Sequence, residues 1–184
     1  MERRDLLRTL GAAAALSFVP REAHAVWSRV AALAAARQTA GGLSGRQLAL
    51  VGAIADTVLP RTDTPGATDV GVPAFVDVIV AEYYADDERA AFLAGLDAVD
   101  AHVRAAQGAP FAELPERVRA VAVESLERAG DRRAEPARTW WRLKGLIVHG
   151  YFTSERAQQE VLRVNPMPGR FDGAAPHPAR AGRS

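Results

Sequence analysis

The amino-acid sequence predicts an all-α protein: a compact array of about six helices with a long Pro/Gly-rich loop and an irregular C-terminal tail. Three observations indicate this class. From residue 44 onward apolar residues recur at spacings of three and four, prolines and glycines divide that pattern into helix-sized lengths, and no segment gives a clear strand pattern. With 184 residues, 48% of them hydrophobic, the chain is long and apolar enough for one domain with its own core.

The first helix of the body is expected to begin after Ser44 and to end before Pro60. Ser44 is a suitable N-cap, and proline disfavours the helical conformation in the residue that precedes it. The apolar positions between them have helical spacing: Leu48, Val51, Ile54, Ala55 and Val58. Residues 61–71 are dense in turn-forming residues and are predicted to form the long loop.

Four further helices follow in the prediction. Pro73 suits the first turn of the second helix, Asp86 or Asp87 is a possible N-cap of the third, and Gly108 is its C-terminal stop. A fourth helix is expected to begin at Leu114-Pro115-Glu116 and to end at Gly130.

Pro136 is expected to begin the fifth helix, and Ser154 to cap a short sixth helix that reaches about Arg163. The Pro- and Gly-rich end of the chain has no apolar pattern of its own, and residues 174–184 are expected to be disordered. Residues 26–43, which are rich in alanine, are expected to form a spacer or a peripheral helix.

Residues 1–25 have the pattern of an export signal. Arg3 and Arg4, then one residue, then Leu6 and Leu7, resemble the twin-arginine signal. The apolar run that follows has about 11 residues, which is short of the roughly 20 that span a bilayer as a helix. Ala23-His24-Ala25 is a small-x-small cleavage site, and Ala23 and Ala25 are its small residues. An ordinary amphipathic first helix is the alternative, and the sequence leaves open whether the signal is cleaved or kept as an anchor.

Composition excludes several classes of chemistry. Because the chain has no cysteine, it has no disulfide, thiolate metal site, iron–sulfur cluster or cysteine nucleophile. The 23 basic and 22 acidic residues give a formal net charge of +1, so no nucleic-acid partner is expected on electrostatic grounds.

No strong catalytic or cofactor-binding motif is present in the sequence. The glycines do not form the Gly-x-Gly-x-x-Gly turn of dinucleotide sites, and no two histidines lie four residues apart as in a zinc helix. His149 lies in a predicted helix near aromatic residues, where it is either a half-buried histidine or a catalytic base. Aspartates near the predicted loop are either calcium ligands or, more simply, caps and turn residues: Asp56, Asp63, Asp69 and Asp77.

The segment from Trp140 to Phe152 is the most aromatic part of the chain. Two adjacent residues on a helix point about 100° apart, so Trp140 and Trp141 cannot both face the core directly. Core packing is one reading of the segment and a partner interface is the other, because Trp, Tyr and Arg are enriched at such interfaces.

Two segments carry a resemblance to a known family. The run LVGAIADTVLPRTDTPGA at residues 50–67 and the run GYFTSE at residues 150–155 resemble the gluconate 2-dehydrogenase subunit 3 family, as does NPMPG at residues 165–169. Over residues 44–173 the chain is therefore similar to a helical domain of that family.

The resemblance implies a non-catalytic accessory subunit that binds no cofactor itself. Its partner would be a large flavoprotein dehydrogenase of the glucose–methanol–choline type, which holds FAD and oxidises a sugar, sugar acid, polyol or glycoside. A cytochrome c subunit often accompanies such a pair. The small subunit's signal would engage the twin-arginine translocon and carry both chains to the periplasm.

The segments with the most specific resemblance contain no evident chemistry, so we expect them to supply the partner interface. The residues concerned are Pro60, Pro65, Gly66, Pro73, Trp140, Trp141, Tyr151 and Phe152. Two other readings remain open at this point: a transient assembly chaperone for the flavoprotein, and a stand-alone periplasmic hydrolase or binding protein that uses His149 and the loop aspartates.

Overall fold

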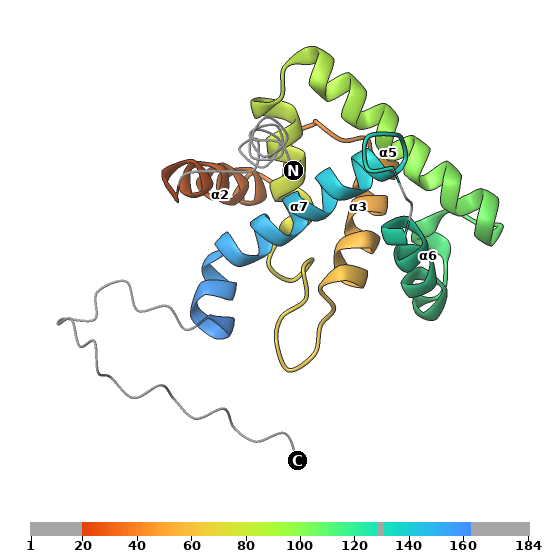
Figure 1. Cartoon of the computed structure of the whole chain (residues 1–184). Helices are drawn as coiled ribbons and strands as arrows, with labels where there is room; N and C mark the ends of the chain where they lie inside the picture. Colours follow the sequence, from red (N-terminus) through yellow and green to blue (C-terminus); the bar gives the residue numbers. More distant parts are fainter. Residues whose placement is uncertain (1–19, 129–130, 163–184) are drawn as a thin grey trace, which may run out of the picture.

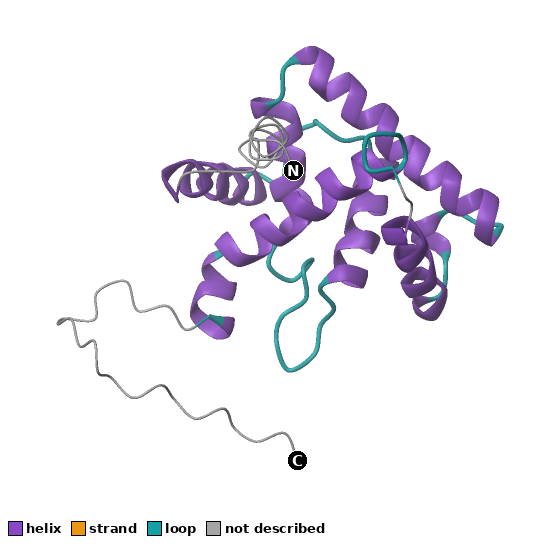
Figure 2. Ribbon diagram, in the orientation of Figure 1, coloured by secondary structure: helices purple, strands orange, loops and turns teal. Residues whose placement is uncertain are grey.

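A computed structural model describes residues 20–128 and 131–162, and all regular structure in these ranges is helical. Figure 2 shows helices joined by loops, with no strand in the described part of the chain. The all-α prediction is therefore confirmed. The elements follow in the order α2 (Pro20–Ala35), α3 (Gly45–Val58), α4 (Val72–Val78), η1 (Ile79–Tyr83), α5 (Asp86–Gln107), η2 (Phe111–Glu113), α6 (Glu116–Arg128), α7 (Ala137–Thr153) and η3 (Ala157–Val161).

Helix α7 is the centre of the arrangement. It crosses the middle of the molecule in Figure 1 and contacts α2, α3, α4, α5, α6 and η3. Its inner face consists of fully buried apolar side chains, among them Trp140, Leu143 and Ile147. Burial of such side chains is the main favourable contribution to folding, so α7 is the element around which the core forms.

Helix α3 begins as the sequence predicts. The Gln47 N–H donates a hydrogen bond to Ser44 Oγ at 3.3 Å, and the Ser44 N–H donates to Gln47 Oε1 at 3.1 Å. This reciprocal pair is a capping box, which satisfies two of the N–H groups that a helix start leaves unpaired. Ser44 is therefore confirmed as the N-cap.

The boundaries of α4 and α5 follow the prediction with one exception. Pro73 lies in the first turn of α4, and Gly108 ends α5 in the left-handed conformation at φ +82°. The predicted caps Asp86 and Asp87 are wrong, because the N-cap of α5 is Ala85. Both aspartates lie in the first turn instead, where a negative charge is favourable beside the positive end of the helix dipole.

The C-terminal part of the fold turns at Ser154. Its hydroxyl accepts a hydrogen bond from the Ala157 N–H at 3.2 Å, and the wider-wound η3 follows. The predicted helix end at Gly130, the expected tail 174–184 and the signal residues Arg3, Arg4, Leu6 and Leu7 lie outside the described residues.

Helix α2 is packed against the rest of the protein. Val26 is completely buried, and the Trp27 ring lies 5.1 Å from the Phe75 ring, centroid to centroid. The Trp27 indole N–H donates a hydrogen bond to Thr153 Oγ1 at 3.1 Å. The helix begins at Pro20, upstream of the segment 26–43 in which a spacer or peripheral helix was expected, and it contributes side chains to the core.

Candidate partner-binding surface

The loop between α3 and α4 has a conformation fixed by side-chain hydrogen bonds. The first set involves Asp56, near the end of α3. The Asp56 carboxylate accepts hydrogen bonds from the Thr68 N–H at 3.0 Å and from the Thr68 hydroxyl at 2.8 Å. The Ala67 N–H also donates to the Leu59 carbonyl oxygen at 3.0 Å. These bonds close the loop at its base, so the chain returns to α4 beside the point where it left α3.

Asp69 holds the middle of the same loop. Its carboxylate accepts a hydrogen bond from the Gly66 N–H at 2.8 Å and forms an ion pair with Arg61. The hydrogen bond from the Arg61 guanidinium, followed by that from the Gly66 N–H, lowers the pKa of Asp69. The loop therefore presents a fixed surface to any partner.

The structure divides the eight residues expected at the interface into two groups. Trp140 and Tyr151 are buried in the core, and Pro65 and Gly66 are buried inside the loop. Pro60 and Phe152 are exposed, while Pro73 and Trp141 are partly exposed. The four buried residues can influence a partner only through the shape of the fold. The four exposed or partly exposed residues are the ones that can touch a partner directly.

Helix α7 exposes apolar side chains on the face that points away from the core. Trp141, Gly145, Val148 and Phe152 follow one another at spacings of four, three and four, which places them on one side of the helix. Val148 and Phe152 each retain 36% of their accessible surface. A helix that is apolar on its outer as well as its inner side is typical of one that a further element covers. We call these four residues the outer α7 stripe.

Trp141 is held in place at one end of the stripe. The Arg132 guanidinium carbon lies 3.9 Å from the Trp141 ring centroid, and Lys144 Nζ lies 5.2 Å from it. Lys144 also forms an ion pair with Glu127 at the end of α6. The two cations lie over the indole, so they hold the ring in place and cover part of it, and only its remaining surface is open to a partner.

Val148 belongs to this surface, although it was not among the residues expected at the interface. The signal was nevertheless available: α7 has no acidic residue, and apolar residues occur on its outer as well as its inner side. Periodicity identifies two apolar faces in such a segment, and only the packing of the other helices determines which of them is covered.

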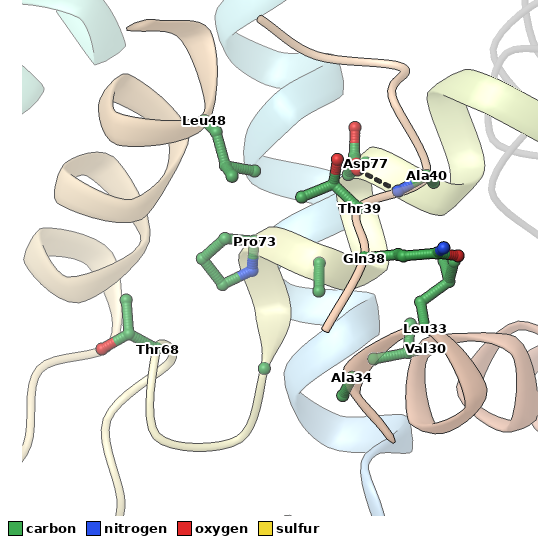
Figure 3. Close-up of a pocket in the computed structure, with 12 residues that line it drawn as sticks. Val30, Leu33, Ala34, Gln38, Thr39, Ala40, Leu48, Thr68, Pro73 and Asp77 are labelled. Carbon is green, nitrogen blue, oxygen red and sulfur yellow. Dashed lines mark hydrogen bonds between the residues drawn. The ribbon is translucent and has the colours of Figure 1, made fainter. Parts of the chain in front are cut away.

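A hollow of about 280 Å³ lies between the end of α2 and the starts of α3 and α4. Figure 3 shows apolar side chains around it, with Asp77 directed toward Ala40. The Asp77 carboxylate accepts hydrogen bonds from the N–H groups of Ala40 at 2.8 Å, Gly41 at 3.2 Å and Leu43 at 2.7 Å. The volume is just below the usual range of ligand pockets, roughly 300–1,000 Å³. The Asp77 carboxylate at its edge is already occupied by hydrogen bonds from backbone N–H groups.

The residues proposed for a hydrolase or a metal site occupy separate structural positions. Asp56 and Asp69 hold the loop, Asp77 holds residues 40–43, and Asp63 accepts a hydrogen bond from the Thr62 hydroxyl at 2.9 Å. His149 lies half-buried beside Phe75, with 6.1 Å between the ring centroids. Within residues 20–128 and 131–162, no group of three or more His, Asp or Glu side chains is placed to hold a metal ion.

Comparison with known proteins gives one result. The model of the family described as gluconate 2-dehydrogenase subunit 3 matches residues 45–169, which is more than half of the chain. The protein belongs to the gluconate 2-dehydrogenase subunit 3 family. No curated protein and no solved structure matches it.

The match divides the fold at a structural boundary. It begins at Gly45, the first residue of α3, and it includes the loop, α7 and the outer α7 stripe. Helix α2 lies outside the matched range, although its side chains complete the core of this subunit 3 domain. None of the helices in the described part of the chain is both long and apolar enough to cross a membrane.

Proposed function

We propose that the protein is the non-catalytic accessory subunit of a periplasmic FAD-dependent dehydrogenase of the glucose–methanol–choline type. Its role is to stabilise the large flavoprotein subunit and to carry it through the twin-arginine translocon. The observation that carries the proposal is the match to the subunit 3 family over residues 45–169. The partner's substrate class is a sugar, sugar acid, polyol or glycoside, and a cytochrome c subunit is a possible third member of the complex.

The outer α7 stripe is the surface that we assign to the flavoprotein. A complex that stays together during translocation needs a large apolar interface, on the order of 2,000 Å² or more in total. Burial of apolar surface contributes roughly 25 cal/mol per Å², so aromatic and aliphatic side chains contribute most of the binding energy. Trp141, Val148 and Phe152 offer such side chains on one helix, and Pro60 is exposed on the loop after α3.

The interface is tested by charge substitutions on the stripe. Phe152→Asp places a carboxylate at the end of the stripe opposite Trp141, and co-purification of the co-expressed flavoprotein should fall at least tenfold. Val121→Asp on α6 is the matched control, because Val121 is 56% exposed and lies outside the stripe. Circular dichroism should show that both variants are folded, with a lower melting temperature for Phe152→Asp, because a carboxylate in the last turn of α7 opposes the helix dipole and part of the phenylalanine contact is lost. Undiminished co-purification with a folded Phe152→Asp variant would contradict the assignment.

The export role is tested separately at the N-terminus. Replacing Arg3 and Arg4 with lysine should leave the flavoprotein in the cytoplasm if it has no signal of its own. A flavoprotein that reaches the periplasm equally well beside this variant would rule out the escort role, whatever the interface experiment shows.

A transient chaperone would share the same binding surface, and stoichiometry distinguishes it from a subunit. A permanent subunit is recovered at one copy per flavoprotein in the purified active enzyme, whereas a chaperone is recovered only with flavoprotein that has not yet incorporated FAD. The family description names a subunit, and for that reason we favour the permanent role.

A further inference from the structure

The expected cleavage site, Ala23-His24-Ala25, lies inside helix α2, which runs from Pro20 to Ala35. A protease that recognises small residues at two alternate positions reads them from the same side of an extended chain, where residues i and i+2 point the same way. In an α-helix the same two residues point about 200° apart. Ala23 is accordingly only 4% exposed, whereas Ala25 points into solvent.

The residues immediately after the site fix this conformation. Val26 is completely buried, and Trp27 packs on Phe75 and donates its indole N–H to Thr153 at the end of α7. An extended conformation of residues 23–26 would withdraw the buried side chains of Ala23 and Val26 from the core. The site therefore becomes readable only when this part of α2 leaves α7.

Further contacts hold α2 one turn beyond the site. Arg29 Nε lies 2.7 Å from Glu82 Oε1 in an ion pair with η1, and Val30 is buried one residue further on. Ala23 itself borders a groove of about 790 Å³ between α2 and the turn after α7, together with Thr153 and Gln158. A protease that enters this groove would reach one side of α2, but most of the Ala23 side chain would stay covered by the protein.

We infer that folding protects this cleavage site, so that the exported chain keeps the residues upstream of Val26. The inference rests on the proposed function in one respect: the twin-arginine route carries proteins that have already folded, so signal peptidase meets α2 in its docked state. The N-terminal segment is then retained because Trp27 and Val26 are packed in the core. The cleavage sequence itself is not the cause.

The first test is the N-terminus of the natural product. The chain is purified with its flavoprotein from the periplasmic fraction, and its intact mass and N-terminal sequence are measured. We expect a chain that begins upstream of Val26. A chain that begins at Val26 would overturn the inference.

The second test loosens α2 without altering the site. Val30→Asp places a carboxylate in the core, whereas Ala31→Asp places the same charge on the exposed side of the helix and serves as the control. Both changes lie beyond residues 23–26. The fraction of chains that begin at Val26 should rise at least tenfold in Val30→Asp and stay at the wild-type level in Ala31→Asp. Trp27→Ala is the milder alternative if Val30→Asp is degraded in the cell.

A test in solution separates this inference from the export proposal. The purified full-length chain is incubated with purified signal peptidase in detergent micelles, where no translocation is needed. The wild-type chain should stay intact, and a chain with undocked α2 should be cut after Ala25. If neither is cut, the sequence is no cleavage site and protection by folding is wrong; if no chain reaches the periplasm in cells, the export proposal alone fails.

Discussion

The Tyr151 hydroxyl donates a hydrogen bond to the Pro65 carbonyl oxygen at 2.7 Å, and both groups are buried. The bond joins the end of α7 to the middle of the α3–α4 loop, 86 residues earlier in the chain. Both segments lie within the range that the subunit 3 family model matches. The hydrogen bond between them sets the position of the loop relative to the outer α7 stripe.

Tyr151→Phe should destabilise the protein by about 1–3 kcal/mol, because it leaves a buried carbonyl oxygen without its donor. Urea unfolding followed by circular dichroism measures the difference in the free energy of unfolding. Tyr83→Phe is the matched control, since Tyr83 is 44% exposed and water can replace a lost hydrogen bond there. Equal stability of the Tyr151→Phe variant and the wild type would show that the loop holds its position without this bond.

Gly95→Ala should destabilise the protein by about 3 kcal/mol, because α5 and α7 approach each other too closely for a methyl group. A Cβ atom at residue 95 would lie 1.9 Å from Thr139 Oγ1 and 2.8 Å from Thr139 Cβ. Gly45→Ala is the control: nothing lies within 4 Å of a Cβ atom there, so stability should be unchanged or rise by up to about 1 kcal/mol. Thermal unfolding of the two variants gives the comparison, and similar melting temperatures would contradict the close approach.

Local chemistry made several helix ends predictable from the sequence. Ser44, Gly108 and Ser154 act through bonds to residues within four positions or through their own φ angle, so a single sequence contains the information. The start of α5 was not predictable in the same way. Asp86 and Asp87 are both good caps, and both equally suit the first turn, where they are found.

The choice between Trp140 and Trp141 depended on tertiary packing. Both lie on α7, and periodicity indicates only that they point in different directions. The buried position of Trp140 follows from the helices that surround α7, and the contact of Trp141 with Arg132 follows from the path of the chain after α6. The buried position of Tyr151 was not predictable for the same reason, because its hydrogen-bond partner in the loop is remote in sequence.

Asp77→Asn should destabilise the protein by about 1.5–3 kcal/mol. The carboxylate accepts hydrogen bonds from three backbone N–H groups in residues 40–43, and the amide of asparagine would turn a donor toward at least one of them. Asp63→Asn, on the exposed part of the loop, is the control for loss of one negative charge. Urea unfolding at pH 7 measures both variants, and equal stabilities would show that the contacts of Asp77 do not hold this segment.

His149 should make the stability of the protein depend on pH below neutrality. Burial beside Phe75 lowers the pKa of His149, because the charged imidazolium is poorly solvated there. Above the ordinary histidine pKa of about 6.5, both the folded and the unfolded state hold a neutral ring, and His149 adds no pH dependence. As the pH falls below about 6.5, the unfolded state takes up the proton first, so the free energy of unfolding decreases until the folded state is protonated as well.

His149→Gln removes the titrating group and keeps a polar side chain at the same position. Its free energy of unfolding should decrease less than that of the wild type between pH 7 and pH 5, as measured by urea unfolding at each pH. His102→Gln on the exposed face of α5 is the control, and it should retain the wild-type slope. If His149→Gln has the same slope as the wild type, the pH dependence belongs to the carboxylates, and burial of His149 is not its cause.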